Sequence, residues 1–213
     1  MKRSLFFAGA AALGLSVVAA LLGAAAPRAQ EPYGPVQPES GEVHLRNIRQ
    51  LTFGGQNAEA YFSASGRLIT FQSARDGYGC DQQYVMNLDG SQVRRVSNGT
   101  GRTTCGYFYD RDRRVLFAST HGASPECPPQ PDMSQGYVWR LDDYDLFTTR
   151  PDGSDLRRLT NTLGYDAEAT LSPDGRTLVF TSMRDGDLEI YTMRTDGSRL
   201  RRLTNQLGYD GGP

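Results

Sequence analysis

Short runs in which apolar and polar residues alternate follow one another from residue 43 onward, separated by turns that contain Gly and Asp. The clearest four runs occupy Ala167–Leu171, Thr177–Ser182, Leu188–Arg194 and Leu200–Thr204. They are rich in β-branched and aromatic residues, which are frequent in strands. Because no segment after the N-terminal region keeps apolar residues at helical spacing, the pattern predicts an all-β protein with almost no helix.

Tight turns join these four runs. Pro173 presets the backbone of the first turn, and Asp174-Gly175 tolerates the positive φ angles of a short hairpin. Arg184-Asp185-Gly186 and Thr195-Asp196-Gly197-Ser198 connect the remaining runs. Four strands joined in sequence by hairpins form a meander, the unit from which propeller blades are built.

The last part of this unit recurs as a short strand, an Asp-Gly turn and a strand with two arginines. The copies read Leu88-Asp89-Gly90-Ser91 to Arg94-Arg95-Val96-Ser97, Pro151-Asp152-Gly153-Ser154 to Arg157-Arg158-Leu159-Thr160, and Thr195-Asp196-Gly197-Ser198 to Arg201-Arg202-Leu203-Thr204. Leu51-Thr52 marks one further unit end, and successive ends are 45, 63 and 44 residues apart. A period in the mid-forties is that of a four-stranded propeller blade, and the longer unit carries an insertion of about 19 residues.

The repeat therefore predicts a β-propeller of four-stranded antiparallel blades, with three full blades and a partial unit at each end. The expected blades are residues 53–97, 98–160 and 161–204, and residues 205–213 begin another unit. Val43–Thr52 resembles a fourth strand without its first three. Since propellers usually have four to eight blades, we expect an incomplete ring whose open blade faces favour self-association.

Two motifs of the cleanest unit point to a known family. Leu171-Ser172-Pro173-Asp174-Gly175-Arg176, followed by Glu189-Ile190-Tyr191-Thr192-Met193, resembles the β-propeller repeat of TolB-like proteins. TolB is the periplasmic component of the Tol-Pal envelope system, and the same repeat occurs in the propeller domains of prolyl-oligopeptidase-type enzymes. The resemblance covers about residues 44–213 and leaves no room for the N-terminal α/β domain of TolB. It implies the scaffold and no single function.

The N-terminal region differs in composition from the repeats. A basic start, an apolar run from Leu5 to Ala26 and a small-residue end at Ala29 predict a signal peptide over residues 1–29. The apolar run is also long enough for an uncleaved N-terminal anchor. Residues 30–42 contain three prolines and are an expected disordered spacer. Both alternatives place the repeats outside the cytoplasm, and we expect a periplasmic location.

Charge and residue content narrow the function classes. Without residues 1–29 the chain keeps 20 basic and 24 acidic residues, a net charge near −4 that argues against nucleic-acid binding. Lys2 is the only lysine, so the repeats hold no Schiff-base, P-loop or Ser–Lys chemistry. The only histidines are His44 and His121, and Gly-x-Ser-x-Gly does not occur. We therefore expect no enzyme activity and no cofactor.

Blade topology sorts the loops onto two faces. Successive hairpins of a meander alternate, so the short Asp-Gly turns fall on one face, here called the turn face, and the longer connections on the other, the loop face. The longer connections are residues 53–59, 74–83, 98–105, 121–143, 161–168, 183–187 and 205–212. Binding residues collect on such loops of a rigid scaffold, so the loop face is the expected partner-binding surface.

All three cysteines, Cys80, Cys105 and Cys127, map to the loop face. In an oxidising compartment the expectation is one disulfide and one remaining thiol. We favour Cys105–Cys127, which would staple the inserted residues to their own blade, and Cys80–Cys105 is the competing pair. Three thiolates with His121 are an allowed zinc ligand set, although their spacing matches no known zinc module. Free buried cysteines are the remaining alternative.

The insertion, His121–Asp143, is the most individual segment, with four prolines ahead of Tyr137 and the only tryptophan, Trp139. Trp and Tyr are enriched at interface hot spots, so Tyr137 and Trp139 are candidate partner-binding residues. The structural alternative is that Trp139 packs over its own blade and pins the loop, as a buried tryptophan does.

Three carboxylates of the loop face are further partner-binding candidates: Glu59, Asp166 and Glu168. Glu59 and Glu168 are equivalent positions of two units and are expected to line the central channel, where acids can hold a cation or a basic peptide. The structural alternative is that the acids of this face pair with Arg75, Arg102 and Arg184.

These observations predict an exported, non-catalytic β-propeller scaffold that binds a protein or peptide partner in the cell envelope. The alternative is the gating propeller of a longer prolyl-oligopeptidase-type hydrolase whose catalytic domain lies outside these residues. A metal-dependent activity at the cysteine or acid cluster is a third hypothesis.

Overall fold

The computed structural model describes residues 36–213, so the predicted signal peptide and the first part of the predicted spacer lie outside the described residues. Blade 1 contains β1 (Gln56–Phe62), β2 (Leu68–Ala74), β3 (Gln82–Asn87) and β4 (Arg94–Arg95). Blade 2 contains β5 (Thr103–Tyr109), β6 (Arg114–Ser119), the 3₁₀ helix η1 (Thr120–Gly122), β7 (Asp145–Thr149) and β8 (Arg157–Arg158). Blade 3 contains β9 (Asp166–Leu171), β10 (Thr177–Ser182), β11 (Glu189–Arg194) and β12 (Arg201–Arg202).

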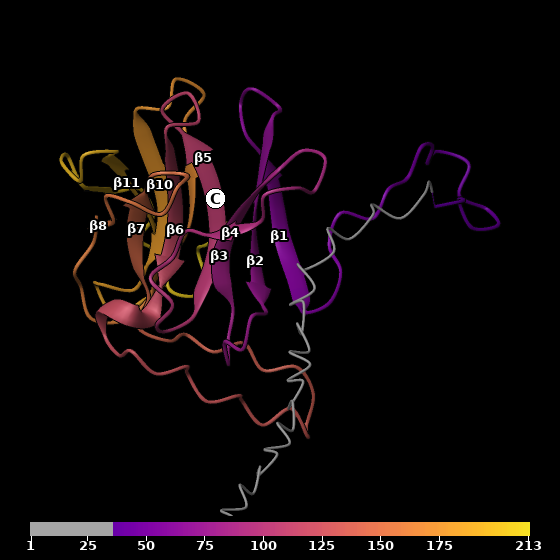
Figure 1. Ribbon diagram of the computed structural model, residues 1–213. Helices are drawn as coiled ribbons and strands as arrows, with labels where there is room; N and C mark the ends of the chain where they lie inside the picture. The colour runs from indigo at the N-terminus through magenta and orange to yellow at the C-terminus, as the bar shows by residue number, and fades with distance from the viewer. Residues whose placement is uncertain (1–35) are drawn as a thin grey trace, which may run out of the picture. The chain divides into compact units, whose positions relative to one another are not determined.

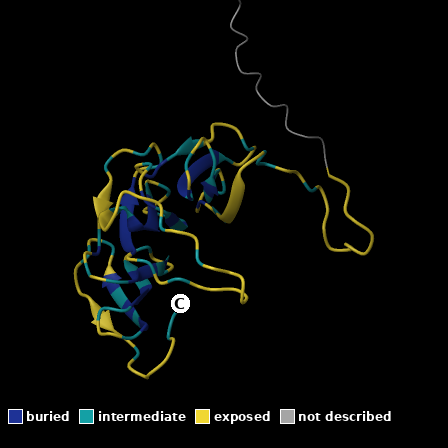
Figure 2. Ribbon diagram, turned by 90° about the horizontal axis from the view of Figure 1, so that it is seen from below, coloured by how far each residue is buried: buried dark blue, intermediate teal, exposed yellow. Residues whose placement is uncertain are grey.

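Each blade is one antiparallel meander whose strands pair in chain order (Figure 1). The predicted fold class is therefore confirmed: the described residues form three four-stranded blades, and η1 is their only helical turn. Seen from below, the blades follow one another along an arc; the middle strands of each blade are largely buried, whereas β1, β8 and β12 are exposed (Figure 2).

The fourth strand of each blade is shorter than predicted. The expected strand Leu200–Thr204 pairs only through Arg201 and Arg202. The hydroxyl of Thr204 then accepts a hydrogen bond from the Ile190 amide at 2.9 Å, and the chain leaves the sheet. Equivalent bonds end the other two fourth strands: the Gln83 amide donates to the Ser97 hydroxyl at 3.1 Å, and the Leu146 amide donates to the Thr160 hydroxyl at 2.8 Å. The repeated Ser or Thr is thus a strand terminator.

Apolar side chains pack between neighbouring blades. Val85 and Val96 of blade 1 meet Val115, Phe117 and Phe147 of blade 2 in one buried cluster. The opposite side of blade 2 contributes Leu116 and Leu146 to a larger cluster with the strands of blade 3. Burial of this kind stabilises by about 25 cal/mol per Å² of apolar surface, so these two clusters hold the neighbouring blades together.

The same backbone bond leads into β5, into β9 and into the segment that follows blade 3. In each case a backbone amide donates to the carbonyl of the residue just before the third strand of the preceding blade. The bonds join Thr103 to Asp81 at 2.8 Å, Asp166 to Tyr144 at 2.9 Å and Asp210 to Leu188 at 2.9 Å. Residues 205–213 therefore repeat the entry into a blade, without forming a strand in the described residues.

The segment 43–52 does not form the predicted strand: among the described residues it makes only an isolated antiparallel bridge, between Ile48 and Val36. Leu51 nevertheless packs against a buried cluster of blade 1, which consists of Ile69, Phe71, Tyr84 and Met86. Val96, the equivalent residue of the next unit end, packs in the same way against the strands of blade 2. A side chain in place of Gly90 would come within 3.1 Å of the Leu51 carbonyl. The glycine of this Asp-Gly turn is thus needed for a close approach to the preceding unit end as well as for its φ of 83°.

Candidate functional site: the loop face and its insertion

The loop-face connections are bonded to one another, which makes this face a connected surface. Three backbone amides of the linkers between blades reach the neighbouring loops: Gly101 donates to the Pro125 carbonyl at 2.8 Å, Gly164 to Asp143 Oδ1 at 3.0 Å and Gly208 to Asp187 Oδ2 at 2.9 Å. The insertion runs along this end of the blades (Figure 1). Long loops on a sheet scaffold are thereby held in fixed positions.

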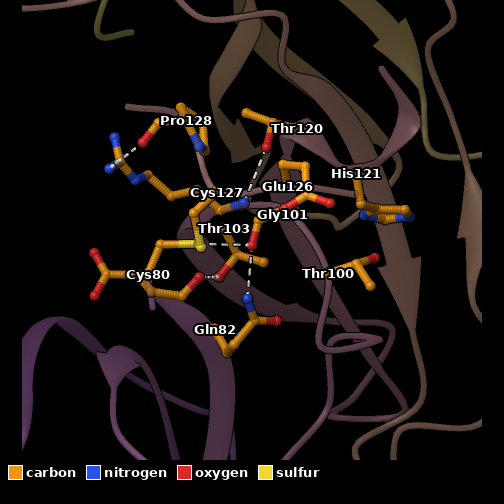
Figure 3. Close-up of a disulfide and its surroundings, with 12 residues drawn as sticks. Cys80, Gln82, Thr100, Gly101, Thr103, Thr120, His121, Glu126, Cys127 and Pro128 are labelled. Carbon is orange, nitrogen blue, oxygen red and sulfur yellow. Dashed lines mark hydrogen bonds between the residues drawn. A yellow bond between two sulfur atoms is a disulfide. The ribbon is translucent and has the colours of Figure 1, made fainter. Parts of the chain in front are cut away.

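A disulfide joins Cys80 to Cys127, with 5.8 Å between their Cα atoms. The favoured pair Cys105–Cys127 and its competitor Cys80–Cys105 are both wrong. The bond links the β2–β3 loop of blade 1 to the insertion of blade 2, beside the linker at Gly101 (Figure 3). It therefore crosses a blade boundary instead of stapling the insertion to its own blade.

Cys105 is the free thiol of the described residues and lies in β5, the innermost strand of blade 2. Burial raises the pKa of the Cys105 thiol; a hydrogen bond with Thr104 opposes that rise, and the charges of Glu59 and Glu168 add to it. Because Cys80 and Cys127 are consumed by the disulfide, the zinc site of three thiolates and His121 is wrong. The described residues also hold no cluster of three or more His, Cys, Asp or Glu side chains suited to a metal.

This pairing predicts slow alkylation of Cys105. We expect iodoacetamide to modify one thiol per folded, oxidised chain, much more slowly at neutral pH than in guanidinium chloride, because the thiolate is the reactive form and burial disfavours it. Peptide mapping under non-reducing conditions should recover the Cys80 and Cys127 peptides as one species. A linked peptide that contains Cys105 would contradict the assignment.

Glu59, Cys105 and Glu168 occupy equivalent positions of the three innermost strands. All three have left-handed backbone conformations, with φ of 50°, 52° and 54°, which place a bulge in β1, β5 and β9. Glu168 accepts hydrogen bonds from Thr181 Oγ1 at 2.7 Å and from the Gly212 amide at 2.8 Å. Its carboxylate thus already binds neighbouring groups, whereas Glu59 is exposed and bonds the Tyr61 hydroxyl.

Asp166 is buried, with 1% of its surface exposed, and is removed from the candidate partner-binding residues for that reason. Its carboxylate accepts from Arg184 Nη2 at 3.0 Å and from the Thr162 hydroxyl at 2.6 Å. Arg184 in turn lies over the rings of Phe180 and Tyr191. The structure therefore supports the structural alternative for this acid.

The second arginine of the fourth strand forms an ion pair in blades 2 and 3, which the sequence pattern did not predict. Arg158 of β8 pairs with buried Asp145 of β7, and Arg202 of β12 pairs with buried Glu189 of β11. In blade 1 the equivalent third-strand residue is neutral Gln82, and Arg95 instead stacks on Tyr78. An acid at the start of a third strand, 13 residues before the second arginine, is the signal that could have found these pairs.

His121 begins the insertion at the position that Arg75 and Arg184 occupy in the other blades. Its ring lies 3.9 Å from that of Phe147, and its Nδ1 is 2.7 Å from Ser119 Oγ. Burial lowers the pKa of His121, and the positive charge of Arg158 lowers it further. The neutral ring is therefore the form that packs in the folded protein.

This depressed pKa predicts a pH dependence of stability. Below the ordinary histidine pKa of about 6.5 the unfolded chain takes up a proton that folded His121 resists, so the free energy of unfolding falls as the pH is lowered through that window. Urea unfolding of wild type and His121→Gln between neutral and mildly acidic pH measures it. The free energy of unfolding of the variant should depend less steeply on pH than that of wild type. An identical pH dependence in the two proteins would contradict the prediction.

Trp139 packs against the segments that lead into and out of blade 3. The indole meets the rings of Tyr165 and Tyr209 edge-on, at centroid distances of 5.9 and 5.1 Å. It remains 43% exposed, and Tyr137 is 84% exposed. Trp139 is thus partly an anchor and partly available, whereas nothing described here packs over most of Tyr137.

A hollow of 220 Å³ lies between the insertion and the blades. We call it the aromatic pocket. Its lining is mixed: the apolar and aromatic residues are Pro131, Met133, Tyr137, Val138, Trp139, Tyr144 and Tyr165, and the polar residues are Arg102, Thr104, Gln130, Arg140 and Asp142. Asp142 at its wall is paired with Arg140 at 2.7 Å and lies 3.8 Å from Arg102. A larger hollow of 360 Å³ nearby is lined by Asp145 and Arg158, which bond to each other.

Comparisons with known proteins agree with this architecture. No family model matches the chain. A TolB homologue from Chlorobium luteolum is 30% identical over 104 residues, which are 48% of this chain and 24% of that protein. The solved structure of a putative TolB from Agrobacterium tumefaciens superposes with a TM-score of 0.55 at 23% identity, over 76% of this chain and 53% of the other.

An enzyme also shares the fold. Puromycin hydrolase superposes with a TM-score of 0.50 at 19% identity, over 83% of this chain and 25% of the hydrolase. The chain thus spans about a quarter of the TolB homologue and about half of the TolB structure that it matches. These similarities establish the type of repeat and the fold of the chain.

The sheets and their junctions define a β-propeller built from four-stranded meander blades. Among propellers, the repeat of this chain is TolB-like, as the sequence motifs predict and as the TolB relatives confirm.

Proposed function

We propose that this TolB-like propeller is an exported, non-catalytic scaffold that binds a protein or peptide partner of the cell envelope through its loop face. The observation that carries the proposal is the insertion, which presents Tyr137 and Trp139 at the surface while the disulfide to Cys80 and the ion pair between Asp142 and Arg102 hold it in place. Exposed aromatic side chains on a rigid support are the usual anchors of protein interfaces. Glu59 and Glu168 are proposed as flanking contacts of this surface.

Export is part of the proposal. The described residues include no helix that is long and apolar enough to span a membrane, and the predicted signal peptide lies outside them. Cell fractionation followed by N-terminal sequencing tests this point. A mature chain that starts near residue 30 in the periplasmic fraction is expected, whereas an intact N-terminus in the membrane fraction would indicate the anchor.

Capture of the partner tests the binding role. The exported full chain, tagged and cross-linked in cells, should recover a partner that is lost at least about tenfold in Tyr137→Ala/Trp139→Ala, since hot-spot truncations cost about 2 kcal/mol or more. Phe62→Ala is the matched control, because Phe62 is an aromatic residue 69% exposed on β1, away from the insertion. Equal recovery by all three proteins would count against the loop face.

The likeness to puromycin hydrolase favours one alternative, the gating propeller of a prolyl-oligopeptidase-type hydrolase. The gene sequence downstream of the codon for Pro213 distinguishes the two. An in-frame Gly-x-Ser-x-Gly would support a nucleophile elbow and the hydrolase; further propeller repeats ending in a stop codon would support the scaffold.

A further inference from the structure

We infer that the aromatic pocket receives one uncharged aromatic side chain from an extended segment of a partner protein. This inference rests on the proposed function, because it names the chemistry by which the loop face would recognise its partner. It concerns the insertion, which the other two blades lack.

Three of the aromatic rings that line the pocket have defined mutual orientations. Trp139 stands at 88° to Tyr165, and Tyr144 stands at 79° to Tyr165. Tyr209, which is not part of the lining, supports Trp139 at an angle of 86°. Aromatic rings prefer edge-to-face or offset contacts, each worth about 0.5–1.5 kcal/mol beyond burial. A further ring that enters the pocket would therefore find ring edges and faces already placed for such contacts.

The charges around the pocket are balanced internally. Asp142 is paired with Arg140 and lies near Arg102, and Arg102 also faces Asp81. Burial raises the pKa of Tyr144 to about 12 and raises that of Tyr165 as well, so both phenols stay neutral. A charged side chain entering here would lose water without gaining a free counter-charge, and charge complementarity therefore selects an uncharged occupant.

The rim of the pocket argues for a chain segment over a free small molecule. Tyr137 is 84% exposed, Met133 46% and Val138 40%, and all three border the hollow. A small molecule that filled 220 Å³ would leave this apolar rim in water. An extended segment covers the rim while one side chain fills the pocket, which is the anchor-in-pocket arrangement of interface hot spots.

The pocket is also preorganised. The disulfide fixes the insertion at Cys127, the Arg140 guanidinium holds the Pro129 carbonyl at 2.7 Å, and Trp139 rests on blade 3. Side chains that are already ordered lose less entropy when a ligand binds, which leaves more of the contact energy for affinity.

Trp139 makes the test direct, because the only tryptophan of the chain lines the pocket. N-acetyl-phenylalaninamide is titrated against the full exported chain and indole fluorescence is recorded. We expect a saturable change in the millimolar range, as suits so small a ligand. N-acetyl-lysinamide and N-acetyl-aspartamide should need at least about tenfold higher concentrations, given the cost of desolvating a charge.

Substitutions at the rim supply the controls. Met133→Asp places a charge at the pocket and should abolish the response, Met133→Leu should keep it, and Phe62→Ala should not affect it. The thermal unfolding midpoint of each variant confirms folding. A charged probe that binds as well as the phenyl probe, or a phenyl response that persists in Met133→Asp, would overturn the inference.

The two proposals can fail separately. If the phenyl probe binds as expected but no cross-linked partner is found, the pocket stands and the partner-binding role falls. If a partner is captured equally by wild type and Met133→Asp and no probe binds, the loop face acts elsewhere and the inference is wrong. Probe-sensitive dimers in sedimentation, or probe binding that appears only after deletion of residues 1–35, would assign the pocket to this chain itself and also overturn it.

Discussion

Asp166→Ala is expected to lower the free energy of unfolding by about 3–5 kcal/mol, because it leaves a buried guanidinium without its counter-charge. The side chain of Arg184 is 14% exposed and that of Asp166 1% exposed. Arg184 cannot turn toward water without giving up its contacts with Phe180 and Tyr191. Urea unfolding followed by Trp139 fluorescence measures the loss.

Glu59→Ala is the matched control, since this acid is exposed and its removal should cost less than about 1 kcal/mol. At temperatures well below its thermal unfolding midpoint, where the variant is folded, Asp166→Ala should still capture the proposed partner as wild type does. A stability change as small as that of Glu59→Ala, or loss of capture by the folded variant, would return Asp166 to the partner-binding residues.

Removal of the disulfide is the second large effect we expect. Cys80→Ser/Cys127→Ser should be less stable than oxidised wild type by about 2–4 kcal/mol, because the closed loop restricts the unfolded chain. It should also weaken the response of Trp139 to the phenyl probe, since the insertion loses its covalent anchor. Denaturant unfolding in the presence and absence of dithiothreitol measures the effect on stability.

Two comparisons control for the substitutions themselves. Reductant should lower the stability of wild type to that of the double variant and leave the double variant unchanged. Cys105→Ser retains the disulfide and should remain sensitive to reductant. A wild type indifferent to reductant would show that the bond is absent or contributes nothing.

The blade architecture was predictable because each level of the sequence agrees with it. The Asp-Gly turns, the strand composition and the period all specify the same meander, and the TolB-like motifs lie within it. The shortness of the fourth strands was not predictable from composition: Leu200–Thr204 has the apolar pattern of a strand, yet the Thr204 hydroxyl replaces a ladder partner and ends the pairing.

The cysteine pairing was not predictable because it depends on distances between loops of different blades. Topology places Cys80, Cys105 and Cys127 on one face, but the left-handed bulge at Cys105 lies on the innermost strand, where Glu59 and Glu168 are its neighbours. Burial of Asp166 escaped prediction for a similar reason. The repeat pattern places Asp166 at the start of an innermost strand, but the reach of Arg184 back to that carboxylate is a matter of side-chain geometry.

The disulfide between blades 1 and 2 also determines how the domain would respond to a pulling force on its ends. The 47-residue separation between Cys80 and Cys127 is closed covalently, so those residues, which would extend by roughly 160 Å, cannot lengthen. Blade 3 has no such bond in the described residues and is free to peel away along its apolar junction. Oxidation thus keeps β3, β4, β5 and β6, which lie between the two cysteines, tethered as one unit, while the strands outside that loop can yield to the force.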